Sequence, residues 1–309
     1  LIGFLLSFLL IMVIHKNKLT LKDNLYKLIS VYSKLNCLYC LIYIFNLINE
    51  CVIRNGIYCS PIYYKESVQL FKIIVIVYIG NSIKICSNII YILININRYM
   101  LIGKEHLSFL KKISIISFKK VYFFNLVFSF IVSFVKLFQY QVNPYYETKD
   151  YPYLRSFTKI ERTNKILLTM FLLFHDLINV FGFLLLSFAI DLIVVLKLRK
   201  ELRNKRKVMA SSNLAYQAMS NIRKEHFRKE IRALIMTILN CIFNFLFRTF
   251  EIFYPIYFIY FTFFPKSYLY DKVCENYYLC DTLSDLTQFF YLLTIITNFI
   301  IFYNFNKKI

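Results

Sequence analysis

Seven long apolar stretches, separated by polar or basic segments, organise this sequence. A helix that crosses a hydrocarbon core of about 30 Å needs roughly 20 apolar residues, at a rise of about 1.5 Å each. The stretches are too continuous for the alternating strands of an outer-membrane barrel, and lipid offers no hydrogen-bond partner to an open sheet. We therefore predict an all-α membrane protein, a seven-transmembrane helix bundle that forms a single domain over residues 1–309. The predicted spans are residues 1–14, 26–48, 68–102, 121–138, 166–196, 233–264 and 283–302.

The first apolar stretch is shorter than the others, since it runs from Leu1 to Ile14 and ends at a basic segment. We interpret it as the inner half of a truncated first helix. The alternative is the apolar core of a signal peptide. Signal peptides carry their positive charges before the apolar run, whereas Lys16 and Lys18 follow this one, so the truncated helix is favoured.

Basic residues concentrate in alternate loops, after the first, third and fifth stretches. The loop after the fifth stretch is the most basic, with Lys197, Arg199, Lys200, Arg203, Lys205, Arg206 and Lys207 followed by Arg223, Lys224, Arg228, Lys229 and Arg232. The other loops are balanced or acidic, as in Asp271, Glu275, Asp281 and Asp285 before the seventh stretch. Because cytoplasmic loops carry the excess of Lys and Arg, we expect the N-terminus outside and the C-terminus in the cytoplasm of a multi-pass plasma-membrane protein.

Composition agrees with a membrane-embedded chain, because 59% of the residues are apolar while the formal net charge is +21. A soluble fold cannot bury so much hydrocarbon, so the charge must lie in loops that flank the bilayer. An alternative reason for the many lysines is base composition, since Asn, Ile, Lys, Phe and Tyr are all encoded by A/T-rich codons. Because of the high apolar content, the lipid bilayer is an expected partner. Nucleic acid is not expected, because the basic segments lie against the membrane.

The sequence carries no catalytic signature that we recognise: no Gly-rich phosphate loop, no Gly-x-Ser-x-Gly elbow and no His-Glu-x-x-His zinc site. The four histidines are scattered, at His15, His106, His175 and His226. We therefore expect neither an enzyme nor a bound cofactor or metal ion.

Cysteines divide evenly between predicted spans and predicted outer loops. The four in outer loops, where oxidation is favoured, are Cys51, Cys59, Cys274 and Cys280. They allow three connectivities, of which we favour the local pairs Cys51–Cys59 and Cys274–Cys280. A metal site is disfavoured, because the four cysteines are not closely spaced ligand pairs with histidines.

Two short motifs lie at the predicted inner ends of spans. Asn97-Arg98-Tyr99 closes the third stretch, and Asn298-Phe299-Ile300-Ile301-Phe302-Tyr303 ends the seventh. They resemble the Asp/Glu-Arg-Tyr triplet and the Asn-Pro-x-x-Tyr signature of rhodopsin-like (class A) G-protein-coupled receptors, here of a divergent invertebrate type. The resemblance covers nearly the whole chain. It implies that an extracellular ligand, a peptide or a chemosensory small molecule, activates a heterotrimeric G protein. It also implies a switch formed by Asn97, Arg98, Tyr99, Asn298 and Tyr303.

Several positions depart from the pattern of that family. Asn97 replaces the acid, the Pro after Asn298 is lost, and the loop of residues 139–163 lacks the cysteine of the usual outer disulfide. The fourth span lacks its usual Trp, and Asn36 stands about where the second helix usually keeps a sodium-binding Asp. The resemblance implies that Arg98 holds the resting state. Without a neighbouring acid, we expect Arg98 to hold that state more weakly. The alternative is that Arg98 is an ordinary positive flank that reaches into the interface.

Among the polar and charged side chains within the apolar stretches, five stand out, since each charge at a helix centre costs about 2.5–3.5 kcal/mol. They are the ligand-pocket candidates Lys84, His175, Asp176, Arg248 and Glu251. Lys84 lies about 21 Å along the helix from Arg98, in the predicted outer half. Arg248 and Glu251 are three residues apart and share a helix face. The same residues could instead form a buried network that only holds helices together.

The family resemblance also argues against one ligand class. Gly80 occupies the position where amine receptors carry an Asp, so an amine held by that salt bridge is disfavoured. Two alternatives to a receptor stay open. One is a transporter or channel in which Lys84, Asp176 and Glu251 line a path, and the other is an orphan seven-span protein that does not signal. The basic loop of residues 197–232 fits either attraction to anionic lipid or a helical extension that meets a G protein.

Overall fold

A computed structural model describes twelve parts of the chain, which include all the apolar stretches at least in part. They are residues 1–16, 24–48, 62, 65–101, 118–138, 140–141, 155–156, 170–211, 231, 235, 237–251 and 277–306. The described residues are helical apart from a few turn residues and a two-residue antiparallel pairing of β1 (Tyr140–Gln141) with β2 (Arg155–Ser156).

Helices occur at each of the predicted stretches. The first and second are α1 (Ile2–Lys16) and α2 (Asn24–Ile48), and the last is α11 (Tyr277–Asn306). The third is one continuous helical run that comprises α3 (Glu66–Phe71), the π-helical segment η1 (Lys72–Ile79) and α4 (Gly80–Leu101). The fourth comprises α6 (Phe118–Ser133) and the 3₁₀ segment η2 (Phe134–Phe138). The fifth comprises residues 170–176, the π-helical segment η3 (Leu177–Gly182) and α8 (Phe183–Ser211), and the sixth is the helix of residues 237–251.

Four of these helices are long and apolar enough to cross a membrane: Asn24–Asn46, Glu66–Met100, Phe118–Phe138 and Met170–Asn204. Ile2–Lys16 and Leu286–Ile301 are apolar but shorter. The prediction of an all-helical protein suited to a membrane is therefore confirmed. The full count of seven crossings stays a prediction.

Some helices extend beyond their predicted ends. The last helix begins at Tyr277 instead of residue 283, so that Cys280, Asp281 and Asp285 lie in α11 and not in a loop. The fifth continues through a Lys-, Arg- and Leu-rich segment to Ser211, beyond residue 196. Neither segment contains the Gly or Pro that would end a helix, and the Lys, Arg, Glu and Leu residues at the end of α8 have good helix propensity.

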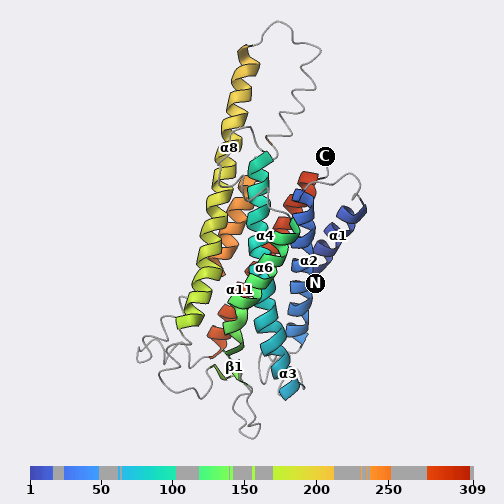
Figure 1. Cartoon of the computed structure of the whole chain (residues 1–309), viewed down its shortest axis with the longest axis vertical. Coiled ribbons are helices and arrows are strands. Elements are labelled where there is room, and N and C mark those ends of the chain that lie inside the picture. Colours follow the sequence, from blue (N-terminus) through green and yellow to red (C-terminus); the bar gives the residue numbers. More distant parts are fainter. Residues whose placement is uncertain are drawn as a thin grey trace.

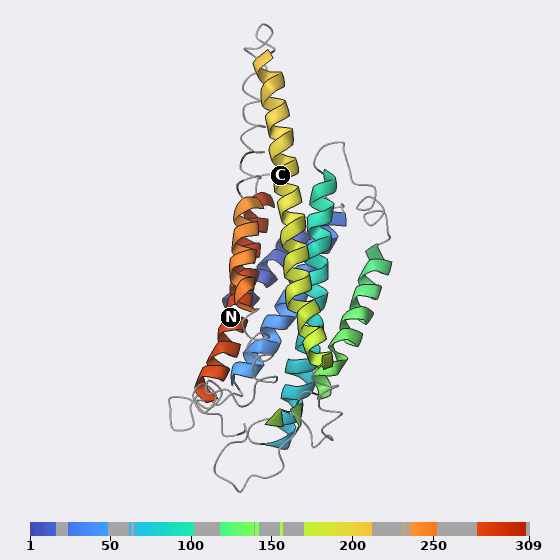
Figure 2. The same ribbon diagram turned by 90° about the vertical axis from the view of Figure 1, so that its left-hand side faces the viewer.

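The helices form an elongated bundle with α4 near its centre (Figures 1 and 2). Helix α4 packs against α2, α6 and α8, while α1 packs against α2 and α11. The far part of α8 extends beyond the other helices at one end of the bundle (Figure 1). This central place gives the α4 side chains access to most of the other helices.

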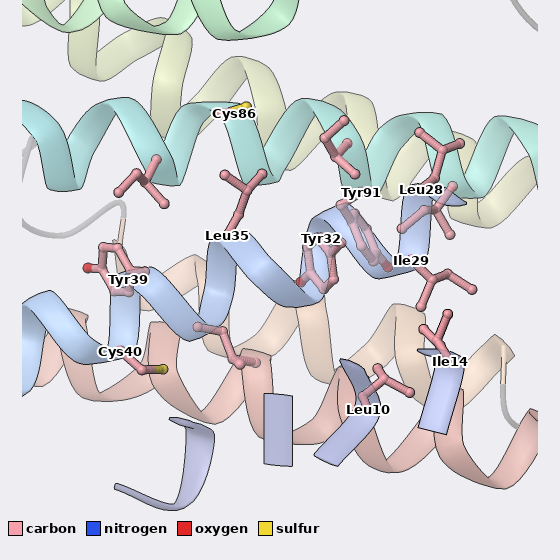
Figure 3. Close-up of a cluster of buried hydrophobic side chains, with 14 of the residues drawn as sticks. Leu10, Ile14, Leu28, Ile29, Tyr32, Leu35, Tyr39, Cys40, Cys86 and Tyr91 are labelled. Carbon is pink, nitrogen blue, oxygen red and sulfur yellow. The ribbon is translucent and has the colours of Figure 1, made fainter. Parts of the chain in front are cut away.

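The apolar core joins α1, α2, α4 and α11, as Figure 3 shows for part of it. Its buried side chains include Leu10, Leu35, Tyr39 and Tyr91. The outward faces of the bundle are also apolar.

Helix α6 gives the clearest example of the lipid-facing pattern. It exposes Phe123 and Phe124, at 70% and 72% of their surface, while it buries Asn125, Ser129 and Ser133. Apolar outside and small or polar inside is the arrangement that a helix adopts when lipid is its solvent.

Candidate functional site

The interior of the bundle contains two groups of polar side chains, at different depths. One, here called the charged cluster, consists of Lys84, Lys136, His175, Asp176, Arg248 and Glu251. The other, the tyrosine cluster, consists of Tyr91, Asp191, Asn240 and Asn244. All ten side chains are buried. Because a buried polar group must be paired to be tolerated in hydrocarbon, these contacts decide how the helices meet.

Lys84 of α4 forms the central contact of the charged cluster. Its Nζ lies 2.9 Å from Glu251 Oε2, which ties α4 to the helix of residues 237–251. The same Nζ lies 4.5 Å from the ring centroid of Tyr291 on α11, a cation–π contact. Lys84 therefore connects the third, sixth and seventh helices.

Arg248 is less well paired than Lys84. Its Nε lies 3.8 Å from Glu251 Oε1, beyond hydrogen-bond distance. Its side chain is only 4% exposed, and its Nε and Nη2 have no hydrogen-bond partner among the described residues. Arg248 and Glu251 thus lie on the shared helix face that the sequence predicts, but the Glu251 carboxylate is closer to Lys84 than to Arg248.

The second half of the charged cluster lies between η2 and the residues that precede η3. Lys136 Nζ and His175 Nδ1 each lie 2.9 Å from Asp176 Oδ1. His175 Nε2 has no hydrogen-bond partner in the described part of the chain. Sequence reasoning found His175 and Asp176 but missed Lys136. A lysine inside the apolar run of residues 121–138 could have identified it, by the rule that charges within membrane spans pair.

Tyr91 of α4 lies at the centre of the tyrosine cluster. Its hydroxyl donates to Asp191 Oδ2 of α8 over 3.1 Å. The hydroxyl oxygen accepts from Asn240 Nδ2 over 2.6 Å and also from Asn244 Nδ2. One hydroxyl thus links the third, fifth and sixth helices, and none of its partners was singled out from the sequence.

Asp191 also supplies a negative charge near the Asn97-Arg98-Tyr99 triplet. It is 2% exposed and interacts electrostatically with Arg98, two helical turns from Tyr91 on α4. Asn97 cannot play this part, because it is uncharged and its amide donates to the Leu93 carbonyl over 2.8 Å. A carboxyl group of α8 therefore lies near the arginine of the triplet.

The last residue of the triplet is held by α8 as well. Lys197 Nζ lies 3.9 Å from the Tyr99 ring centroid and donates to the Tyr99 carbonyl over 3.3 Å. Tyr99 is buried against Ile190 and Val194 of the same helix. The triplet thus lies in the contact between α4 and α8.

Further polar contacts join the second, third and seventh helices. Ser87 Oγ donates to Asn36 Oδ1 over 2.8 Å. Asn298 Nδ2 donates to the Tyr32 hydroxyl over 2.8 Å, and the Tyr32 and Tyr91 rings lie 6.0 Å apart. Asn298, predicted as part of the switch, is therefore in the interior next to the tyrosine cluster. Tyr303 lies on α11, and its side chain is outside the described part of the chain.

The side chains of the four cysteines in the predicted disulfides all lie outside the described part of the chain. Cys51, Cys59 and Cys274 lie outside the described residues, and of Cys280 only the helical backbone is described. The cysteines whose side chains are described, Cys37, Cys40, Cys86 and Cys241, are all free. Both local pairs stay predictions.

Two polar stripes face one another through the bundle. On α4, Lys84, Tyr91 and Arg98 are seven residues apart and fall within about 40° of arc. On the sixth helix, Asn240, Asn244, Arg248 and Glu251 fall within about 80° of arc over about 16 Å. The two helices match in antiparallel register, Glu251 with Lys84 and the two Asn side chains with Tyr91.

Comparison with models of protein families finds no match for this chain, and a search of curated proteins finds none either.

Proposed function

We propose that this chain is a seven-helix receptor of the plasma membrane, which converts binding of an extracellular ligand into activation of a heterotrimeric G protein. The observation that carries the proposal is the pair of matched stripes on α4 and the sixth helix. They connect the charged cluster near one end of the bundle with Arg98 near the other.

The stripes supply what a receptor needs physically. A ligand shifts a conformational equilibrium only if it binds one arrangement better than the other. A ligand that competes for Lys84 or Glu251 changes the contact between α4 and the sixth helix. Because Asn240 and Asn244 lie on the same rigid helix as Glu251, that change reaches Tyr91 and, through Asp191, the surroundings of Arg98.

The described geometry also favours a resting state held at the Arg98 end. Tyr91 and Asp191 bridge α4 and α8, and both Asn side chains bring the sixth helix against them. In the active state we expect the sixth helix to move away from Arg98, as the family resemblance implies. The basic end of α8 would then lie on the cytoplasmic side, where the G protein binds.

The test is guanine-nucleotide exchange on purified heterotrimeric G proteins with the full chain in lipid nanodiscs. We expect the wild type to stimulate exchange and Arg98→Ala to lose that stimulation. Lys65→Ala, which removes an exposed cation at the start of α3, is the matched control and should leave exchange unchanged. A wild type that stimulates no G-protein class, with any ligand pool, counts against the proposal.

A transporter or channel is the second candidate, favoured by charged side chains buried in the bundle, among them Lys84, Lys136, Asp176, Asp191 and Glu251. The receptor is preferred because Lys84 with Glu251 and Lys136 with Asp176 form close ion pairs across helix contacts, as in a stabilised resting state. Solute or proton flux in liposomes that falls with Glu251→Gln, without any nucleotide exchange, would support the transporter.

A further inference from the structure

In the described part of the chain, the charged cluster has one site at which positive charge exceeds negative charge. Lys84 and Arg248 lie at a single carboxylate, that of Glu251, while the neighbouring Lys136 is matched by Asp176. The excess of one positive charge is in the bundle interior, where an uncompensated charge is costly. Among the described residues, Nε and Nη2 of the buried Arg248 guanidinium have no hydrogen-bond acceptor.

The surroundings of this site are aromatic. Tyr291 lies beneath the Lys84 ammonium, and Tyr39 packs edge-on against Tyr291 with ring centroids 4.9 Å apart. A ligand whose polar group is bound by Arg248 would therefore have aromatic side chains beside the rest of the molecule.

From this charge balance we propose that Arg248, with Lys84, binds the anionic group of a small organic acid whose body is apolar or aromatic. This inference rests on the proposed function, because it names the ligand class of the same receptor. A carboxylate suits a guanidinium best, since the two can form a pair of parallel hydrogen bonds. Glu251 then has the opposite role: it competes with the ligand for both cations.

The competition predicts substitutions of opposite sign. Arg248→Gln removes the main donor and should weaken binding of the acid about tenfold or more, as expected for a hydrogen bond to a charged group. Glu251→Gln leaves both cations without a carboxylate and should tighten binding about tenfold. A purely structural role for the cluster predicts no dependence on the acid for either variant.

Binding can be measured without a G protein, as thermal stabilisation of the purified full chain in detergent. The buried thiols of Cys40, Cys86 and Cys241 report unfolding through a thiol-reactive dye, which is useful because the chain has no tryptophan. The probes are acetate, octanoate and phenylacetate, each with its matching amide and amine, in a chloride-free buffer. Sodium chloride forms a separate arm.

At millimolar concentration we expect octanoate or phenylacetate to raise the unfolding midpoint, and the amides and amines not to. Lys119→Gln, a loss of one exposed cation on α6, should bind like the wild type. If Arg248→Gln fails to fold, the increase with Glu251→Gln still decides the matter. The inference is overturned if amines stabilise as well as acids, if chloride alone stabilises, or if no acid does.

The outcome separates this inference from the proposed function. If an acid stabilises the chain but does not change nucleotide exchange, the binding site is supported and the receptor function is not. If nucleotide exchange responds to other ligands while no acid binds, the receptor function is supported and this ligand class is excluded.

Discussion

The contact between Tyr91 and Asp191 offers the sharpest test of how the resting state is held. Asp191→Asn keeps the shape of the side chain and removes its charge. The Tyr91 hydroxyl, 3.1 Å from Asp191 Oδ2, would then donate to a neutral amide oxygen. Hydrogen bonds to charged groups contribute about 1.5–3 kcal/mol and neutral ones about 0.5–1.5 kcal/mol, so the bridge between α4 and α8 weakens by about 1 kcal/mol.

A change of about 1 kcal/mol corresponds to roughly a fivefold shift in a two-state equilibrium. If the active state is a minor population held back by this bridge, ligand-independent exchange should rise about fivefold. The loss of attraction between Asp191 and Arg98 acts in the same direction, so the fivefold rise in exchange is a lower bound. The variant should still fold, because Asn fills the same space as Asp, although the lost attraction to Arg98 lowers the free energy of unfolding.

The assay is basal nucleotide exchange by the variant and the wild type at equal receptor density. Glu66→Gln is the control, because it removes one carboxylate charge at an exposed position of α3. Tyr91→Phe, which deletes the shared hydroxyl, should raise basal exchange further. Basal exchange that stays within twofold of the wild type in both variants, or that falls, refutes a resting state held by the tyrosine cluster.

Other predictions test the remaining contacts. Lys84→Met should lower the thermal stability of the ligand-free chain, because it leaves Glu251 with only the more distant Arg248, and Glu251→Gln should lower it by up to about 3–5 kcal/mol, because Lys84 and Arg248 lose their shared carboxylate. The double variant should lose less than the sum of the two single losses, and additive losses would mean that Lys84 and Glu251 are not coupled. Asn298→Ala should cost about 0.5–1.5 kcal/mol by removing the hydrogen bond that Asn298 donates to the buried Tyr32 hydroxyl, seen as a lower unfolding midpoint, while exposed Ile300→Ala should change the midpoint little. An epitope tag between the fifth and sixth helices should stay hidden from antibody on intact cells and become accessible after permeabilisation; labelling of intact cells would invert the predicted orientation.

Sequence reasoning located the helices well because their signal is strong. Long apolar runs leave few alternatives to a helix, and each predicted stretch contains one. It was weaker at helix ends, as at Tyr277 and Ser211, because the change from apolar to polar marks the membrane boundary and not the end of the helix. A helix continues into water until Gly, Pro or a competing hydrogen bond stops it.

The site was predicted only in part, for a different reason. Charges inside apolar runs were visible, so Lys84, His175, Asp176, Arg248 and Glu251 were found. Which cation meets which carboxylate depends on the rotation of each helix. The spacing of three residues indicated the Arg248–Glu251 pair but not the closer contact of Lys84 with Glu251. No one-dimensional pattern contains that rotation.

The tyrosine cluster shows why neutral polar residues matter as much as charges in such a bundle. In lipid, apolar side chains gain little by moving from tails to neighbouring helices, so specific polar contacts choose which helices meet. Tyr91 satisfies one carboxylate and two amides with a single hydroxyl, and removing any partner leaves another buried polar atom to be satisfied. Two alternative arrangements of the sixth helix can therefore differ by only one or two hydrogen bonds. A difference that small is within reach of the binding energy of a small ligand at Arg248, which is what coupling along this helix requires.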